Sequence, residues 1–280
     1  RQPRQWNTSG EEEEQKMAIE LKNVSFAYPN GYVANENLNL TIEKGEKIAI
    51  VGQNGAGKTT AVKLMNGLNR PSCGDVLVDG VNTKEKSCAW ISGKVGYVFQ
   101  NPDDQIFNST ALAEIQYMPK YFKLPESEIK KRTDRAVELT GIGKYLTMNP
   151  LDIPYAIRKF VAIAAIIATE PDYLILDEPT AGQDKRGNET LERIIEELGR
   201  EGTGVIAISH DMDFVAANFP RIIAMAHKNI IADGTAREIF WNEDVVRESK
   251  IKMPQIAKIA SELGLSGNIL FRSELTQAVR

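Results

Sequence analysis

One segment of the chain has the residue types and the spacing that bind phosphate groups. It reads Gly-Gln-Asn-Gly-Ala-Gly-Lys-Thr-Thr and fits the pattern Gly-x-x-x-x-Gly-Lys-Ser/Thr in full. Its glycines let backbone N–H groups curl around an anion, Lys58 can reach the β- and γ-phosphates, and the Thr59 hydroxyl can complete a Mg²⁺ shell. A strand before it and a helix after it favour nucleotide binding over a glycine-rich turn without a ligand. The segment comprises Gly52, Gln53, Asn54, Gly55, Ala56, Gly57, Lys58, Thr59 and Thr60.

Two adjacent carboxylates end an apolar run later in the chain. Residues 173–176 predict a buried strand, and Asp177 and Glu178 follow it directly. At the end of a parallel strand beside a phosphate loop, Asp177 can hold the Mg²⁺ water shell. Glu178 can then polarise a water for in-line attack on the γ-phosphate. The alternative is a pair of solvated acids that begin a turn.

A histidine follows another apolar run. Residues 204–208 predict a further buried strand, and His210 comes two residues after it. A single histidine at such a place is more often structural than catalytic. Beside a phosphate loop and an acidic pair, however, His210 is well placed to hydrogen-bond the γ-phosphate. We therefore count it among the candidate catalytic residues.

These side chains need strands and helices to hold them in place. β-Rich segments cover residues 19–26, 38–42 and 47–51, and the last is apolar without alternation, as in a strand buried on both faces. The predicted helices are residues 58–68, 110–120, 126–140 and 154–169. We expect an α/β fold, because an α-helical insert inside an α/β core fits this order better than two sequential domains.

The composition excludes several classes of protein. The chain has 280 residues, 42% hydrophobic and 26% charged, which excludes disorder, collagen or coiled coil for the chain as a whole. A net charge of -4 provides no basic field, so we expect no nucleic-acid partner. The longest apolar run, residues 160–168, is too short to cross a bilayer. We expect Cys73 and Cys88 to be reduced thiols inside a cell, packed as small buried hydrophobes.

The motifs together carry a resemblance to a known family. Five segments stand in the order found in ATP-binding-cassette (ABC) ATPases, and the match runs from about residue 18 to 239. They are residues 52–60, Tyr97-Val-Phe-Gln100, residues 174–180, residues 181–184 and Ser209-His210-Asp211. Within the family, the strings Phe-Ala-Tyr-Pro-Asn-Gly (26–31) and Gln-Asn-Pro-Asp-Asp-Gln (100–105) look like the ATPases of energy-coupling-factor transporters, which import vitamins, cobalt or nickel.

The resemblance implies roles for residues outside the phosphate loop. Tyr28 matches the aromatic residue that stacks on adenine; Tyr32 is a weaker candidate, and packing of Tyr28 on the core is the alternative. Gln100 matches the glutamine that touches Mg²⁺ or the attacking water and retracts when ATP leaves, with a polar turn as the alternative. Asp184 matches the aspartate that reaches across a dimer of cassettes, with a solvated turn as the alternative.

A loop just past Gln100 is expected to meet a membrane partner. Asp103, Asp104 and Gln105 stand where family members contact their integral-membrane subunit. Without the resemblance, these three would be read as solvated loop residues.

The chain departs from the family pattern at one motif. Family members carry Leu-Ser-Gly-Gly-Gln at a helix N-terminus, where it grips the γ-phosphate of ATP bound to the partner chain; residues 153–157 here read Ile-Pro-Tyr-Ala-Ile. Pro154 has neither a hydroxyl nor an N–H, and Tyr155 places a ring where no side chain should project. Proline in the first turn still starts a helix well. We therefore expect an intact helix with a damaged grip at this dimer contact.

These observations lead to one functional hypothesis and two alternatives. We expect an ATP- and Mg²⁺-dependent ATPase at the cytoplasmic face of the membrane, the peripheral motor of an energy-coupling-factor importer, paired with a second ATPase whose signature segment is intact. The alternatives are a soluble ABC-type ATPase that acts on DNA or ribosomes and a regulatory subunit that binds nucleotide without hydrolysis.

The expected domain organisation has three parts. A P-loop NTPase core spans residues 17–240, with a mostly parallel sheet, an antiparallel β region and an α-helical subdomain inserted at about residues 101–170. Residues 1–16 form a solvated tail or a cloning remnant. Residues 241–280 form a small C-terminal helical appendage, whose apolar residues either pack on their own domain or add a dimer contact.

Overall fold

The computed structural model describes residues 17–265 and 268–279, so the predicted tail at 1–16 lies outside the described residues. Its strands form two sheets, a four-stranded one in the order β2-β1-β4-β5 and a six-stranded one in the order β10-β9-β3-β8-β7-β6. The first sheet contains β1 (Ala18–Ala27), β2 (Val33–Glu43), β4 (Cys73–Val78) and β5 (Val81–Asn82). The second contains β3 (Lys47–Val51), β6 (Val95–Val98), β7 (Tyr173–Asp177), β8 (Gly204–Ile208), β9 (Arg221–Ala226) and β10 (Asn229–Gly234).

The six-stranded sheet is parallel apart from its edge strand. Strands β9, β3, β8, β7 and β6 run in the same direction, and β10 pairs antiparallel with β9. The four-stranded sheet is antiparallel throughout. The fold is therefore the expected P-loop α/β core with a mostly parallel sheet and an antiparallel β region.

Both faces of the parallel sheet are buried, as the unbroken apolar strands predict. Alternate residues of β3 and β8, such as Ala49 and Val205, face a core formed with the helices that follow. Their neighbours Ile48 and Ile206 face the second core, which the antiparallel sheet and the first helix cover. This rigid central layer fixes where each strand ends.

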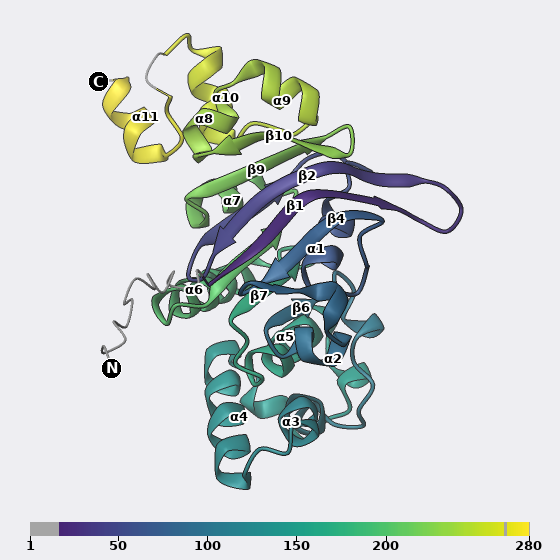
Figure 1. Cartoon of the computed structure of the whole chain (residues 1–280). Coiled ribbons are helices and arrows are strands. Elements are labelled where there is room, and N and C mark those ends of the chain that lie inside the picture. Colours follow the sequence, from purple (N-terminus) through teal and green to yellow (C-terminus); the bar gives the residue numbers. More distant parts are fainter. Residues whose placement is uncertain (1–16, 266–267, 280) are drawn as a thin grey trace, which may run out of the picture.

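The helices lie on both sides of these sheets (Figure 1). They are α1 (Lys58–Met65), α2 (Cys88–Ser92), α3 (Ala111–Tyr121), α4 (Glu126–Thr140), α5 (Tyr155–Ile167), α6 (Lys185–Arg200), α7 (Met212–Asn218), α8 (Ala236–Phe240), α9 (Glu243–Ser249), α10 (Gln255–Glu262) and α11 (Arg272–Ala278). Helices α3 and α4 lie at the opposite end of the molecule from α8 to α11, and α5 leads back from them to the central sheet (Figure 1).

Two expectations differ from the structure. Cys73 and Cys88 are both exposed thiols rather than buried hydrophobes, because Cys73 begins a strand at the margin of the antiparallel sheet and Cys88 begins a short surface helix. The proline of the departing motif precedes its helix instead of standing in the first turn: Pro154 is the N-cap residue of α5. Among the described residues, no helix has the length and apolar character needed to cross a membrane.

Candidate functional site

The predicted chemical groups meet at one edge of the parallel sheet. Strands β3, β8, β7 and β6 are neighbours in that order, and the carboxyl end of each leads into a segment predicted to be functional. Parallel strands place their carboxyl ends at a common edge, which is the usual binding crevice of such sheets. A cavity of about 450 Å³ opens there, lined by Asn54, Gly55, Gly57, Lys58, Thr59, Thr60, Gln100, Asp177, Glu178, Ala181, Ile208 and His210.

The phosphate loop connects β3 to α1, and the side of the loop that faces away from the cavity contacts β9 and the end of α9. A Cβ on Gly52, whose φ is 146°, would lie only 2.2 Å from the carbonyl oxygen of Met225, so a side chain there is excluded. Gln53 N donates to the carbonyl of Ser249 at 2.9 Å, which brings the end of α9 against the loop. The loop's front therefore faces the cavity while its back is packed against β9 and α9.

Lys58 lies at the start of α1 and is 6% exposed. Its Nζ donates to the carbonyls of Gly52 at 2.7 Å and Gln53 at 3.0 Å, so the side chain folds back over its own loop. Burial lowers the pKa of the ammonium, and the nearby carboxylates Glu178 and Asp177 oppose that shift. The group is a cation poised at the loop, where a triphosphate can replace the backbone carbonyls as its partner.

Asp177 ends β7 and is 4% exposed. The buried Tyr97 hydroxyl, on the neighbouring strand β6, donates to Asp177 Oδ2 at 2.7 Å. This contact raises the pKa of Tyr97 in addition to the larger effect of its burial. Tyr97 thus fixes the orientation of the carboxylate that sequence reasoning assigns to the metal shell.

Glu178 is the first residue after β7 and is 8% exposed. Its backbone is left-handed, with φ of 48°. Oε2 accepts a hydrogen bond from His210 N at 3.2 Å, whereas Oε1 lies 3.4 Å from His210 Nε2. Burial raises the pKa of Glu178 to about 7, with a smaller contribution in the same direction from Asp177. A carboxylate with such a pKa is suited to proton transfer near neutral pH.

His210 follows β8 and brings a ring to the same cavity. Its Nε2 lies 3.0 Å from Asn54 Oδ1, so the ring donates to the phosphate loop when that nitrogen is protonated. Burial and the positive charge of Lys58 lower the pKa of His210. The neutral imidazole is therefore the expected form at neutral pH, with one N–H available as a donor.

Tyr28 is the first residue after β1, and its side chain lies next to the phosphate loop. Its hydroxyl is 3.0 Å from Thr60 Oγ1, and its ring is 38% exposed. The ring packs edge-on against Phe26 at 5.0 Å and stacks with Tyr32 at 6.4 Å between centroids. Both the predicted aromatic and its weaker alternative, Tyr32, therefore lie together, and both offer exposed ring surface.

Gln100 lines the cavity, and the loop that follows it is anchored internally. Gln105 Oε1 accepts from Phe99 N at 3.1 Å, and Gln105 Nε2 donates to the carbonyl of Ala162 in α5 at 3.3 Å. Asp103 is exposed and pairs with Arg158 of α5 at 2.5 Å, while Asp104 faces solvent. Of the three residues predicted to meet a membrane partner, the two aspartates are exposed, whereas the glutamine hydrogen-bonds within the protein and connects its loop to α5.

Helix α5 begins within residues 153–157, the segment that departs from the family pattern, and it begins beside the site. Pro154 and Tyr155 are exposed, and no side chain among the described residues caps the first N–H groups of α5. Asp184 is also exposed, and its Oδ1 accepts from Gly187 N at 2.8 Å as the N-cap of α6. These three residues do not line the cavity, and they present their side chains to solvent.

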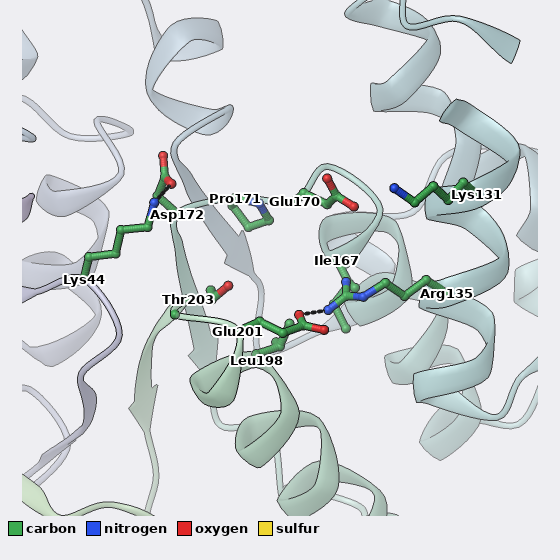
Figure 2. A pocket seen from close by; sticks show the side chains of 11 residues that line it. Lys44, Lys131, Arg135, Ile167, Glu170, Pro171, Asp172, Leu198, Glu201 and Thr203 are labelled. Carbon is green, nitrogen blue, oxygen red and sulfur yellow. Dashed lines mark hydrogen bonds and ion pairs between the residues drawn. The ribbon is translucent and has the colours of Figure 1, made fainter. Parts of the chain in front are cut away.

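A second cavity, of about 430 Å³, lies at the amino ends of β7 and β8 and contains none of the predicted site residues. Figure 2 shows charged side chains facing one another across it from α4 and from loops of the core. Lys44 pairs with Asp172, and Arg135 of α4 pairs with Glu201 after α6. Most of these charges are neutralised in pairs, so the cavity does not resemble an anion site. The ion pairs across it connect helix α4 to the core.

Sequence reasoning missed three polar residues that support the site. Tyr97 orients Asp177; Lys159, 1% exposed, donates from α5 to the carbonyls of Glu178 and Ala181; and Asn35, fully buried in β2, donates to the carbonyl of Gly57 at 3.2 Å. Tyr97 is the one residue with a polar group in the apolar strand β6, and Lys159 directly precedes the apolar run of α5, so both could have been noticed as polar groups at apolar positions. Asn35 lies among several other polar residues of β2, so no local pattern distinguishes it.

Comparisons with known proteins agree with this geometry. The family model described as ABC transporter matches residues 35–181. A putative ABC transporter ATP-binding protein of Pyrococcus furiosus is 41% identical over 88% of this chain and 94% of its own length. The energy-coupling factor transporter ATP-binding protein EcfA of Methanothermobacter thermautotrophicus is 36% identical over 89% of this chain and 81% of its own length.

Solved structures are also similar. The structure of cbiO1 from Clostridium perfringens, described as part of the ABC transporter complex cbiONQ, matches with a TM-score of 0.75 and 31% identity over 90% of this chain and 100% of that one. The ATP-binding cassette MJ0796, solved as a dimer in a post-hydrolysis state with ADP and Pi, matches with a TM-score of 0.71 and 26% identity over 78% of this chain and 98% of that one.

Proposed function

Because the chain belongs to the ATP-binding subunits of ABC transporters, we propose that it drives an importer of the energy-coupling-factor type, in a head-to-tail dimer with a second, different cassette. The ATPase activity follows from the family. The importer type is supported by the EcfA relatives and by the structural similarity to cbiO1. The dimer is supported by the two-cassette structure of MJ0796 with ADP and Pi.

We assign the hydrolytic step to residues around the 450 Å³ cavity. Glu178 is the general base that orients and deprotonates the attacking water, and its raised pKa suits that task. Lys58 and the N–H groups of the phosphate loop hold the β- and γ-phosphates. His210 donates from its neutral ring to the γ-phosphate, and Tyr28 stacks on the adenine.

The same cavity suits a magnesium ion. Thr59, Gln100 and Asp177 supply a hydroxyl, an amide oxygen and a carboxylate from three different elements, and hard oxygen donors of this kind are what Mg²⁺ prefers. When bound with ATP, the ion would neutralise phosphate charge. Tyr97 supports this assignment because it holds the Asp177 carboxylate in one orientation.

One observation carries the unequal dimer: the N-terminus of α5 lacks the serine hydroxyl and the glycines of the Leu-Ser-Gly-Gly-Gln segment. Pro154 has neither a hydroxyl nor an N–H, and Tyr155, which is 43% exposed, places a ring where a glycine would admit an anion. Lys58, Asp177, Glu178 and His210 are all in place on the same chain. A partner with an intact Leu-Ser-Gly-Gly-Gln segment would therefore complete this chain's own ATP site.

ATP turnover of the purified chain, alone and with a candidate second cassette, tests the unequal dimer. We expect the mixture to hydrolyse ATP at least about tenfold faster than either chain alone, because one composite site becomes complete. Glu178→Gln in this chain should abolish turnover of the mixture while trapping bound ATP. The control replaces residues 153–157 by Leu-Ser-Gly-Gly-Gln, which should give the chain turnover by itself. Equal turnover with and without the second cassette contradicts the proposal.

We also place an integral-membrane subunit against the loop after Gln100, with the chain bound peripherally at the cytoplasmic face. Asp103 and Asp104 are exposed there, and Phe107 is 65% exposed beside them. Asp104→Arg should weaken binding to membranes that contain the transporter at least about tenfold, since it reverses one exposed charge. ATP affinity should not change, because Asp104 does not line the cavity. Lys185→Glu, a charge reversal at a 90% exposed side chain, is the matched control. Unchanged binding of the Asp104 variant would remove this surface from the proposal.

A further inference from the structure

Lys159 is a buried cation for which the reaction outlined above has no use. It lies on α5 and is 1% exposed. Its side chain is among the largest that are fully buried in the described part of the chain. Its Nζ donates to the carbonyl oxygens of Glu178 at 2.8 Å and Ala181 at 3.0 Å. Burial lowers its pKa, so the interior position is costly for the charged form. Lysine is rarely buried without a specific partner, and here both hydrogen-bond partners are backbone atoms.

The two acceptors belong to the segment that positions the general base. Glu178 has a left-handed backbone with φ of 48°, a conformation that surrounding contacts must hold. Its N–H donates to Ile208 O at 2.9 Å, its carboxylate accepts from His210 N at 3.2 Å, and its carbonyl accepts from Lys159. The first two contacts come from β8 and the residues after it. Lys159 thus connects Glu178 to helix α5 by a hydrogen bond.

The first turn of α5 touches the same segment at further points. Gln183 Nε2 donates to the carbonyl of Ala156 at 3.0 Å. A Cβ on Gly182 would lie 3.4 Å from the Tyr155 ring, so this glycine and the ring are in close contact. With Lys159, these contacts join one end of α5 to residues 178–183. A displacement of that helix end must therefore displace the backbone next to Glu178.

We propose that Lys159 is a positioning residue that couples the N-terminus of α5 to the catalytic glutamate of the same chain. The inference deepens the proposed function and rests on its assignment of Glu178 as the general base. In a head-to-tail dimer, the N-terminus of α5 faces the nucleotide bound by the partner. Lys159 then links occupancy of that weakened site to the geometry of this chain's own hydrolytic site, through two hydrogen bonds to the backbone.

Hydrogen exchange in the isolated chain tests the structural half of this inference. Lys159→Met keeps an unbranched apolar side chain as far as the ε position but removes the ammonium. The amides of Ala181 and Gln183, which bond to Glu178 O at 3.3 Å and Thr180 O at 3.0 Å, should exchange at least about tenfold faster in this variant. Lys159→Arg, which retains the charge and donors, should restore slow exchange. Lys131→Met, an exposed lysine of α4, is the control and should match the wild type.

Steady-state kinetics of the complex with a second cassette test the functional half. Lys159→Met should lower kcat about tenfold or more and leave KM for ATP within about twofold, because the phosphate loop keeps its contacts while the base is misplaced. Lys159→Arg should recover most of kcat. If the Met variant does not fold, Lys159→Gln, which keeps one donor, replaces it and should give an intermediate loss.

Two results would overturn the inference. One is wild-type exchange at residues 178–183 together with wild-type kcat in Lys159→Met. The other is a fall in melting temperature with kcat and KM changed alike, which indicates a purely structural lysine. Glu178→Gln separates this from a failure of the proposed function: if that variant still hydrolyses ATP, the assignment of the base is wrong whatever Lys159 does.

Discussion

At the scale of single residues, the site depends on the different environments of two neighbouring carboxylates. Asp177 is held by the Tyr97 hydroxyl at 2.7 Å, whereas Glu178 keeps one buried oxygen without a hydrogen bond from any described residue. Burial raises the pKa of Glu178 to about 7. Adjacent acids with separated environments can take separate roles, one binding and one transferring a proton. The sequence predicts these two roles, but the separate environments of the two acids are visible only in the fold.

The raised pKa of Glu178 predicts a pH-dependent stability in metal-free, nucleotide-free buffer. In the unfolded chain the carboxyl ionises near pH 4.5, whereas in the fold it ionises near pH 7, so folding stability decreases as the pH rises through this interval. Glu178→Gln removes the ionisation and should stabilise the chain by about 2–3 kcal/mol at pH 8 and by much less at pH 4.5. Urea unfolding at both pH values in EDTA measures the difference.

Asp152→Asn, at an exposed acid outside the site, controls for the general effect of removing a negative charge. An equal gain at both pH values in Glu178→Gln would show that the carboxyl is not perturbed by the fold.

At the scale of elements, the phosphate loop is shaped as much by what lies behind it as by its own glycines. Asn35 of β2 donates to Gly57 O, and the carbonyl of Met225 in β9 stands where a Cβ of Gly52 would be. The pattern of residues 52–60 predicted a loop between a strand and a helix, and the structure has that arrangement. The pattern could not reveal these contacts, because Asn35 and Met225 come from strands far away in the sequence.

Two of the loop's three glycines, Gly52 and Gly55, should therefore respond differently to substitution. Gly52→Ala forces a Cβ to within 2.2 Å of Met225 O at φ of 146° and should cost about 2–4 kcal/mol of folding free energy. Gly55→Ala meets nothing within 4 Å at φ of 81°, so only backbone strain of about 1 kcal/mol is expected. Urea unfolding of both variants measures the difference, and equal losses would contradict the packing described here.

Secondary structure follows the sequence closely in several elements. Helix α4 and strand β3 have the predicted bounds, and α5 differs by one or two residues at its ends. The predicted elements did not include helix α6 or strands β4, β5, β6, β9 and β10. Strands β9 and β10 form a hairpin at the sheet edge, with β9 pairing parallel to β3, and that long-range pairing cannot be read from local pattern.

At the scale of the whole molecule, the parallel sheet explains why distant motifs meet. The parallel-strand argument predicted that Lys58, Glu178 and His210 lie together, and the family resemblance added Gln100. The structure brings all four to one cavity. Side-chain contacts between layers were not predictable in this way. Lys159 and Tyr97 reach their partners across helix-to-strand and strand-to-strand contacts whose register only the fold defines.

The second cavity shows how the parts of the chain are joined. Ion pairs such as Arg135 with Glu201 connect α4 to the core across it (Figure 2). Outside the cavity, Arg193 Nη2 of α6 donates to the carbonyl of Leu139 in α4 at 2.8 Å. Exposed ion pairs contribute little stability each. These polar contacts at the edge of α4 add to the apolar ones that Ala136, Val137 and Leu139 of the same helix make with the core.

The exposure of both thiols gives the protein its own pair of spectroscopic attachment points. Cys73 and Cys88 are the two cysteines of the chain, and neither lines the nucleotide cavity. Maleimide dyes or spin labels can react with them without any engineered substitution.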